Sequence, residues 1–420
     1  MRSVLHVFWA TMERALPRVG TAVVMLCFAR YTSPEAVGIY SWVALAYTLY
    51  QAIAEMGLRT LAVLSMRNAE DLRYVRRRTR LAAVLGSALL GCVLLGLWLA
   101  YPQRWQIVAG LVPFAIVPFI TTAHIVPSAV LQFDQRWREL ARQQLVAAVT
   151  ALTASLAIVL TVHLSLAMAV HALVTETVFL VLSRRAVRGR MPVADQGSRH
   201  PQREAPGLVT VNVLGWVQNQ LERVFIGALA GPAVLGLYST ASALGRSPNE
   251  ALAAATGNYV RSRVANSVDP DVHARALRTI GLISSGGAAC AVLALVALLD
   301  LVFTPFLGPA YGPTLRAAPL FAVATIPLSM SLTMQLVAIS SGRSKASIIA
   351  GCVGLCFSLP IGLLATVTVH WAALMVVAKE VAVLLVTYGL ARPPGARLPV
   401  VLAVALTLAA TGVLELFLLV

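Results

Sequence analysis

The chain has 420 residues, of which 59% are hydrophobic and 12% are charged, and its formal net charge is +16. A soluble domain of this size needs a larger share of polar surface, so the composition excludes that class and indicates a polytopic membrane protein. The net charge alone also fits a nucleic-acid binder, but the positions of the basic residues argue against one.

Apolar stretches long enough to cross a bilayer, about 20 residues each, recur along the whole chain. We count roughly thirteen predicted spans: 8–29, 37–56, 81–100, 107–131, 143–162, 164–183, 207–229, 233–256, 279–304, 315–339, 346–368, 370–390 and 398–419. The first stretch carries several charges and lacks a small-residue cleavage site, so we expect a transmembrane helix there and not a signal peptide.

The basic residues are distributed unevenly between the loops. With the N-terminus placed in the cytoplasm, most of them fall in cytoplasmic stretches such as 59–80 and 184–203, whereas the opposite side holds only Arg30, Arg104 and Arg316. This positive-inside asymmetry predicts a multi-pass protein of the inner (cytoplasmic) membrane with a cytoplasmic N-terminus. We expect the surface charge to have anionic membrane lipids as its partner, and not nucleic acid.

The most polar stretch, residues 184–206, contains three prolines and separates two groups of six spans. It predicts a flexible cytoplasmic linker between an N-terminal lobe, 1–183, and a C-terminal lobe, 207–390. Residues 391–420 add a further span. The expected fold is therefore an all-α polytopic membrane protein, with two parallel six-helix lobes related by pseudo-twofold symmetry and about one extra C-terminal helix.

A repeated octapeptide supports this two-lobe arrangement. Pro34–Ser41 returns as Pro232–Ser239, 198 residues later, and each copy opens a predicted span. An even number of spans separates the copies, so both have the same orientation, which is typical of duplicated transporters with a path between their halves. The copies diverge further along the helix, where Thr48 aligns with Arg246 and Ala52 aligns with Glu250.

Ionisable side chains within the predicted spans are functional candidates, because inserting each one costs about 2.5–3.5 kcal/mol. Polar stripes occur on four spans: Glu13, Arg14 and Arg18 on the first; Tyr47, Gln51 and Glu55 on the second; Asn212, Trp216, Asn219, Glu222 and Arg223 on the seventh; Tyr238, Ser242, Arg246 and Glu250 on the eighth. Stripes this polar are not tolerated against lipid, so we expect them to face a common interior cavity.

The charge of this predicted cavity favours an anionic ligand that carries sugar. Its arginines are Arg14, Arg18, Arg223 and Arg246. Guanidinium groups bind phosphate oxygens through paired hydrogen bonds and stay charged in a low dielectric, while amide and tyrosine side chains suit sugar hydroxyls. For Arg223 and Arg246 the alternative is structural, since ion pairs with the neighbouring Glu222 and with Glu250 would fix helix packing.

Other intramembrane charges have simpler interpretations. Lys379 and Glu380 are adjacent and favour a structural or interfacial pair. Glu176 is a lone acid in the sixth span and a candidate proton relay. The five cysteines lie inside apolar spans and read as small buried residues. No phosphate-binding loop, metal-ligand spacing or nucleophile elbow is present, so we expect no enzymatic activity and no cofactor or metal.

Several motifs resemble the polysaccharide exporters of the MOP superfamily, the O-antigen flippase type. The segments that carry the resemblance, in order along the chain, are Ala29–Tyr40, Leu221–Gly227, Gly236–Ser239, Phe306–Tyr311 and Ser341–Lys345. It extends over about residues 8–390. The seventh-helix acid is Glu222 where the family usually has Asp, and the family usually has twelve or fourteen spans.

The resemblance implies export of an undecaprenyl-diphosphate-linked oligosaccharide across the cytoplasmic membrane by alternating access. It implies that cationic residues of the first and eighth helices, here Arg14, Arg18 and Arg246, hold the diphosphate. Ion coupling through Glu13, Glu176 or Glu222 is compatible with it. Implied partners are the lipid-linked oligosaccharide, the polysaccharide polymerase and the chain-length machinery.

Two other functions remain open. A multidrug or cation antiporter of the same superfamily shares the fold, but it is expected to favour acidic over cationic sites. A membrane-bound sugar-chain polymerase or ligase needs a large external loop with polar residues, and the external loops predicted here are short.

Overall fold

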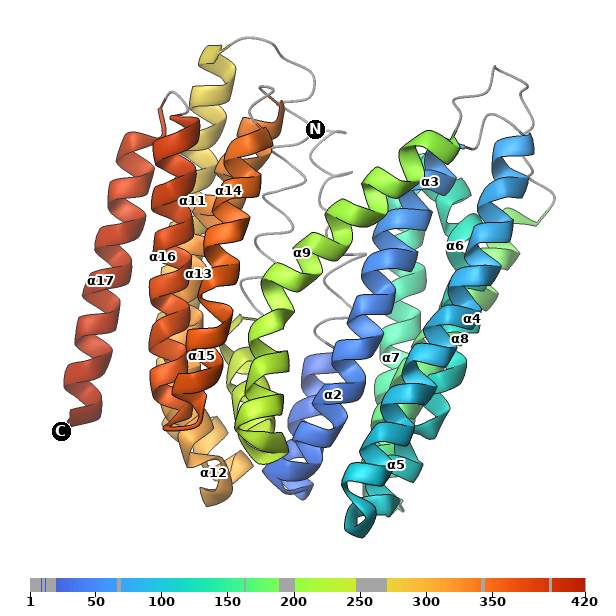
Figure 1. The fold of residues 1–420 in the computed structure, drawn as a ribbon, viewed down its shortest axis with the longest axis horizontal. Coiled ribbons are helices and arrows are strands. Elements are labelled where there is room, and N and C mark those ends of the chain that lie inside the picture. Colours follow the sequence, from blue (N-terminus) through green and yellow to red (C-terminus); the bar gives the residue numbers. More distant parts are fainter. Residues whose placement is uncertain are drawn as a thin grey trace. The chain divides into compact units, whose positions relative to one another are not determined.

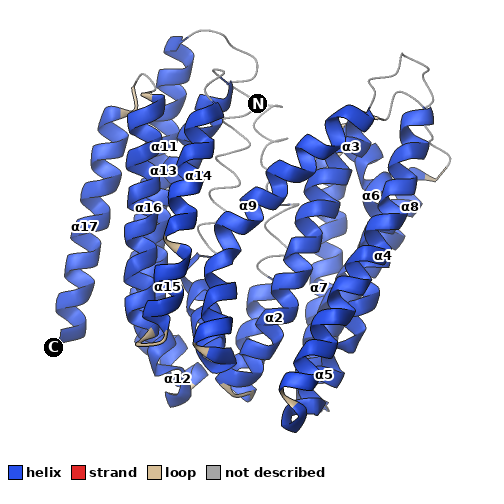
Figure 2. Ribbon diagram, viewed as in Figure 1, coloured by secondary structure: helices blue, strands red, loops and turns tan. Residues whose placement is uncertain are grey.

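The computed structural model describes residues 9, 12, 20–65, 69–161, 164–188, 201–246, 270–340, 344–392 and 395–419. Within these ranges the chain is helical and contains no strand (Figure 2). An all-α chain is therefore confirmed. It divides into two compact units: unit 1 comprises Met1–Thr32 and Ile39–Gln220, and unit 2 comprises Ser33–Gly38 and Leu221–Val420.

Figure 1 shows the described helices in chain order. Up to the middle of the chain they are Gly20–Tyr31, α2 (Pro34–Gln51), α3 (Arg59–Leu64), α4 (Ala69–Ala100), α5 (Trp105–Leu111), α6 (Val117–Phe133), α7 (Trp137–Thr161), α8 (Leu164–Val187) and α9 (Pro201–Leu229). A helix over 231–246 comes next, followed by α11 (Pro270–Leu298), α12 (Thr304–Leu307), α13 (Gly312–Ser340), α14 (Ser344–Cys356), α15 (Ser358–Ala365), α16 (Val369–Ala391) and α17 (Arg397–Leu419).

Among the described residues, nine helices are long and apolar enough to cross a membrane, and the bent pair Ser285–Leu298 and Leu301–Leu307 is a tenth candidate. Large apolar side chains on these helices are exposed, including Leu85 at 60% and Leu408 at 63%. Apolar surface of this extent is stable only against lipid. The chain is thus a multi-pass membrane protein. The predicted spans 8–29 and 233–256 extend outside the described residues.

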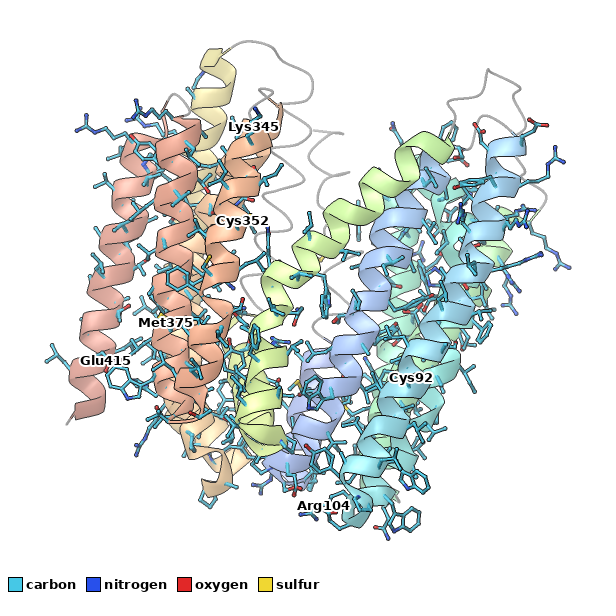
Figure 3. All side chains as sticks on the ribbon, viewed as in Figure 1. Cys92, Arg104, Lys345, Cys352, Met375 and Glu415 are labelled. Atoms are coloured by element: carbon cyan, nitrogen blue, oxygen red, sulfur yellow. The ribbon has the colours of Figure 1, made fainter. Side chains whose placement is uncertain are left out.

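The cysteines are not buried as predicted. Four of them, Cys92, Cys290, Cys352 and Cys356, are exposed, and Cys27 is half-buried. Figure 3 labels Cys92 on α4 and Cys352 on α14. These helices are long and apolar enough to cross a membrane, and a thiol is apolar enough to lie on a face exposed to lipid.

In unit 1, α8 packs against α5, α6 and α7, and α4 packs against α6. α4 ends at Ala100, two residues before Pro102, which cannot donate a helical hydrogen bond. The arginine-rich starts of α4 and α7 and the end of α8 lie at the same end of the unit (Figure 1). This clustering is what the distribution of charge between the loops predicts for one membrane face.

In unit 2, α13 is the central helix and packs against α11, α14, α16 and α17. The helix over 231–246 lies close to it. A Cβ atom on Gly245 would be 2.4 Å from the carbonyl oxygen of Ala318, so only glycine permits this approach. Thr314 Oγ1 of α13 also donates to the carbonyl oxygen of Leu237 at 3.0 Å.

Residues Pro34–Gly38 of the first octapeptide copy pack against the second copy within unit 2. A Cβ atom on Gly38 would lie 1.7 Å from the carbonyl oxygen of Pro232, and one on Gly236 would lie 1.9 Å from the carbonyl oxygen of Pro34. Each glycine therefore meets the proline of the other copy, at a distance that no other residue allows. The repeated Pro-x-x-x-Gly pattern encodes a reciprocal helix contact as well as a duplication.

The ends of the predicted linker 184–206 are helical. α8 continues to Val187 with Arg184 and Arg185 in its last turn, where positive charge stabilises the helix dipole. α9 begins at Pro201, and the compact units divide within α9, after Gln220. The domain boundaries predicted at 183 and 207 thus fall inside helices, and residues 189–200 lie outside the described part of the chain.

Candidate functional site

Glu222 of α9 is the centre of a buried charge cluster in unit 2. Its side chain is fully buried and accepts hydrogen bonds from Lys379 Nζ at 2.8 Å and from Tyr238 Oη at 2.7 Å. Arg246 Nη1 lies 3.5 Å from the same carboxylate. A buried carboxylate is stable only with such partners, and two of these three carry positive charge.

A second carboxylate, Glu380, extends this cluster. Its Oε1 lies 3.8 Å from Arg246 Nη2 and 3.9 Å from Lys379 Nζ. The Arg246 guanidinium carbon also lies 5.4 Å from the ring centroid of Phe321, a cation–π distance. Arg246 is therefore held by two carboxylates and an aromatic ring, deep inside unit 2.

The ion pairs differ from those that sequence proximity predicts. Glu222 pairs with Arg246 and Lys379, which lie 24 and 157 positions away in the sequence. Lys379 and Glu380 do pair, but as members of the larger cluster. Glu250, the predicted partner of Arg246, lies outside the described residues.

Arg223 makes a different kind of contact. It is half-buried, and its Nη2 donates to Ser242 Oγ at 2.9 Å. This hydroxyl belongs to the helix over 231–246 and orients the guanidinium. Ser242 and Tyr238, predicted to line a cavity, are both buried and make these contacts to Arg223 and Glu222.

Unit 1 contains a separate acid site around Glu176 of α8. His124 Nε2 of α6 lies 2.6 Å from Glu176 Oε2, and Tyr47 Oη of α2 donates to Glu176 Oε1 at 3.0 Å. The His124 side chain is 1% exposed and packs edge-on against Phe179, with ring centroids 4.9 Å apart. Glu176 is thus not a lone acid: it forms a buried carboxylate–imidazole pair.

The remaining predicted site residues are spread over the chain. Trp216 Nε1 donates to Thr48 Oγ1 at 3.0 Å within unit 1, so the residue that aligns with Arg246 anchors a tryptophan. Asn219 is exposed and bonds within its own helix to Gly215, while Gln51 is half-buried. Five other predicted residues have positions or side chains that the structure does not describe: Glu13, Arg14, Arg18, Glu55 and Asn212.

The family model for a polysaccharide biosynthesis protein matches residues 27–307, which include α2 to α11 and both octapeptide copies. The chain belongs to this family. A comparison with curated protein sequences finds no match.

Solved structures share the fold of this polysaccharide biosynthesis protein at low identity. The lipid II flippase MurJ, in an inward closed conformation, aligns with a TM-score of 0.69 and 11% identity over 98% of this chain and 92% of that chain. An inward-facing multidrug resistance MATE family transporter of the MOP superfamily aligns with a TM-score of 0.63 and 12% identity, over 94% of this chain and 98% of that chain. A MOP superfamily transporter from Pyrococcus furiosus aligns with a TM-score of 0.59 and 14% identity, over 98% of this chain and 95% of that chain. The chain therefore has the MOP fold.

Within this polysaccharide biosynthesis protein, sequence reasoning missed His124 and Phe321 as members of the two sites. His124 is an isolated histidine in an apolar stretch, and no local pattern links it to Glu176, 52 positions later. Lys379 and Glu380 could have been assigned to the site from the sequence, because adjacent charges within a span require partners from another helix. Among the described residues, no three His, Cys, Asp or Glu side chains are grouped as a metal site.

Proposed function

We propose that the protein is a flippase which moves an undecaprenyl-diphosphate-linked oligosaccharide from the inner to the outer face of the cytoplasmic membrane. The observation that carries the proposal is the combination of family and fold: a polysaccharide biosynthesis protein with the MOP transporter fold. It acts by alternating access of its two halves, as a transporter and not an enzyme. Its N-terminus and arginine-rich loops face the cytoplasm.

The diphosphate binds to arginines, since guanidinium groups match phosphate oxygens in geometry and charge. Arg223 is suited to this role because its guanidinium is half-buried and is oriented by the hydrogen bond to Ser242. Arg14 and Arg18 complete the set, as the sequence analysis predicts. For Arg246 the two carboxylate contacts favour a positioning role, in which it fixes the helices that carry Arg223 and Ser242.

Alanine substitutions separate these roles. Arg223→Ala is expected to abolish surface polysaccharide and to cause lipid-linked oligosaccharide to accumulate on the inner leaflet, with unchanged thermal stability. Arg223→Lys restores only part of the transport, because an ammonium group lacks the paired donors. Arg246→Ala is expected to lower thermal stability as well. Normal export by Arg223→Ala, at wild-type protein levels, would overturn this assignment.

Ion coupling is proposed to use the Glu176–His124 pair. The carboxylate and imidazole are 2.6 Å apart and buried, so the pair has the geometry to hold and pass on a proton. The hydroxyl groups of Tyr47 and Thr121 also face the carboxylate. In proteoliposomes with a proton gradient, Glu176→Gln is expected to remove the dependence of transport on the gradient. Retention of that dependence would exclude this pair.

A cation antiporter is the second candidate, and the observation that favours it is the same buried carboxylate in a fold shared with MATE transporters. Deletion of the protein distinguishes the two functions. Drug sensitivity without accumulation of lipid-linked oligosaccharide would support the antiporter. Accumulation without a change in drug sensitivity supports the flippase.

A further inference from the structure

A basic groove lies at the arginine-rich end of unit 1, where α7 begins and α8 ends. It has a volume of about 790 Å³ and is open to the surface. Four arginines line it, Arg136, Arg138, Arg142 and Arg185, together with the single acid Glu139. The charge of the lining is therefore +3, which attracts an anion.

Not all of these arginines are equally available to a ligand. Arg136 pairs with Glu139, and Arg138 lies over the ring of Trp9 at 5.9 Å. Arg142 and Arg185 are exposed, and neither forms an ion pair with another described residue. These two guanidinium groups come from different helices and line the same groove, so they form its ligand-binding part.

The helices that carry these arginines are locked together. Gln143 Oε1, next to Arg142, accepts a hydrogen bond at 3.0 Å from Ser183 Oγ, two residues before Arg185, and both polar side chains are buried. Leu140, Ala147 and Phe179, on either side of this bond along the helices, form part of a packed core. The spacing of the two arginines is thus set by packing before any ligand binds.

The far part of the groove is apolar. Val146 and Leu182 line it about one helical turn from the arginines. Val146 is 48% exposed and continues into Leu145 and Val149, which are 46% and 54% exposed. Because α7 is a candidate membrane span, this surface contacts lipid. The groove therefore changes from cationic to apolar in the direction from the arginine-rich end into the bilayer.

We propose that this groove is a binding site for an anionic phospholipid. The phosphate contacts Arg142 and Arg185, and an acyl chain lies along Val146 and Leu182. A free phosphate ion would use only the cationic part, and a zwitterionic lipid would gain less from a site of net charge +3. The inference rests on the membrane assignment and not on the transported substrate.

The site can be tested by measuring which lipids stay bound to the purified protein in detergent. No bilayer is present there, so attraction to a charged membrane surface does not contribute to the result. We expect phosphatidylglycerol to remain bound in native mass spectrometry, and phosphatidylethanolamine to be lost. In Arg142→Gln/Arg185→Gln the affinity for phosphatidylglycerol is expected to fall by about ten- to thirtyfold, from the typical contribution of an arginine near an anionic headgroup.

The matched control removes the same charge from α4, at the same end of unit 1. Arg77 and Arg80 are exposed and lie outside the groove, so Arg77→Gln/Arg80→Gln is expected to change the affinity less than about twofold. An equal loss of affinity for phosphatidylglycerol in both double variants would overturn the proposed site. So would competition by inorganic phosphate at concentrations similar to those of the lipid. Unchanged melting temperatures show that the variants are folded.

Discussion

The reciprocal contact between the octapeptide copies leads to a quantitative prediction. In Gly38→Ala the new methyl carbon would lie 1.7 Å from the Pro232 oxygen, and in Gly236→Ala it would lie 1.9 Å from the Pro34 oxygen. Such contacts are essentially never shorter than 3.0 Å, so the two helices must separate by about 1 Å. The obstructing atoms are backbone carbonyl oxygens, which cannot rotate away as a side chain does.

The energy of each substitution has two parts. Overpacking of this kind costs up to about 3 kcal/mol, and alanine gains about 0.5–1 kcal/mol over glycine in a helix. The net loss for Gly38→Ala is therefore about 2 kcal/mol, or roughly 4–8 °C in melting temperature for a unit of this size. Because one separation of the helices relieves both clashes, Gly38→Ala/Gly236→Ala should lose less than the sum of the single variants.

Thermal unfolding in detergent, followed by tryptophan fluorescence, measures this loss. Gly91→Ala and Gly96→Ala on α4 are the controls, since a Cβ atom at either position meets nothing within 4 Å. They are expected to match the wild type or to be slightly more stable. The reasoning fails if Gly38→Ala is as stable as the controls, or if the losses of the two single variants add fully.

Two further predictions concern the charge cluster and the topology. Glu222→Gln should lose about 3–5 kcal/mol of stability, because Lys379 and Arg246 lose their buried carboxylate partner. The double variant Glu222→Gln/Lys379→Met should lose less, because it also removes one of the two unpaired charges. Equal melting temperatures for Glu222→Gln and the wild type would contradict this prediction. In a cysteine-free chain, Ala233→Cys is exposed and should react with an impermeant maleimide in intact cells, whereas Arg77→Cys should react only after lysis. The reverse pattern would invert the topology.

Membrane spans are predictable from sequence because apolar length is a local property. The predicted spans 315–339 and 370–390 agree with α13 and α16 to within about three residues at either end. Where charge continues a helix beyond the apolar core, as at the start of α4, the helix is longer than its apolar stretch. The octapeptide was visible as a repeat, but its role as a contact depends on the tertiary structure.

The site was less predictable because its partners are distant in the sequence. Glu222 and Lys379 are 157 positions apart, so no local pattern pairs them. Sequence reasoning offered the neighbouring Arg223 as a structural partner of Glu222, whereas the carboxylate pairs with the distant Arg246 and Lys379. Likewise, it identified Glu176 as a functional acid but not the histidine that contacts it.

Translocation by the purified protein tests the central proposal most directly. The protein is reconstituted into liposomes with a fluorescent undecaprenyl-diphosphate-linked oligosaccharide, and a membrane-impermeant quencher reports which leaflet holds the label. Wild type and Arg104→Ala, a control at an exposed arginine (Figure 3), should move the lipid much faster than protein-free liposomes, whereas folded Arg223→Ala should not. Wild-type movement no faster than in protein-free liposomes would contradict the proposed function.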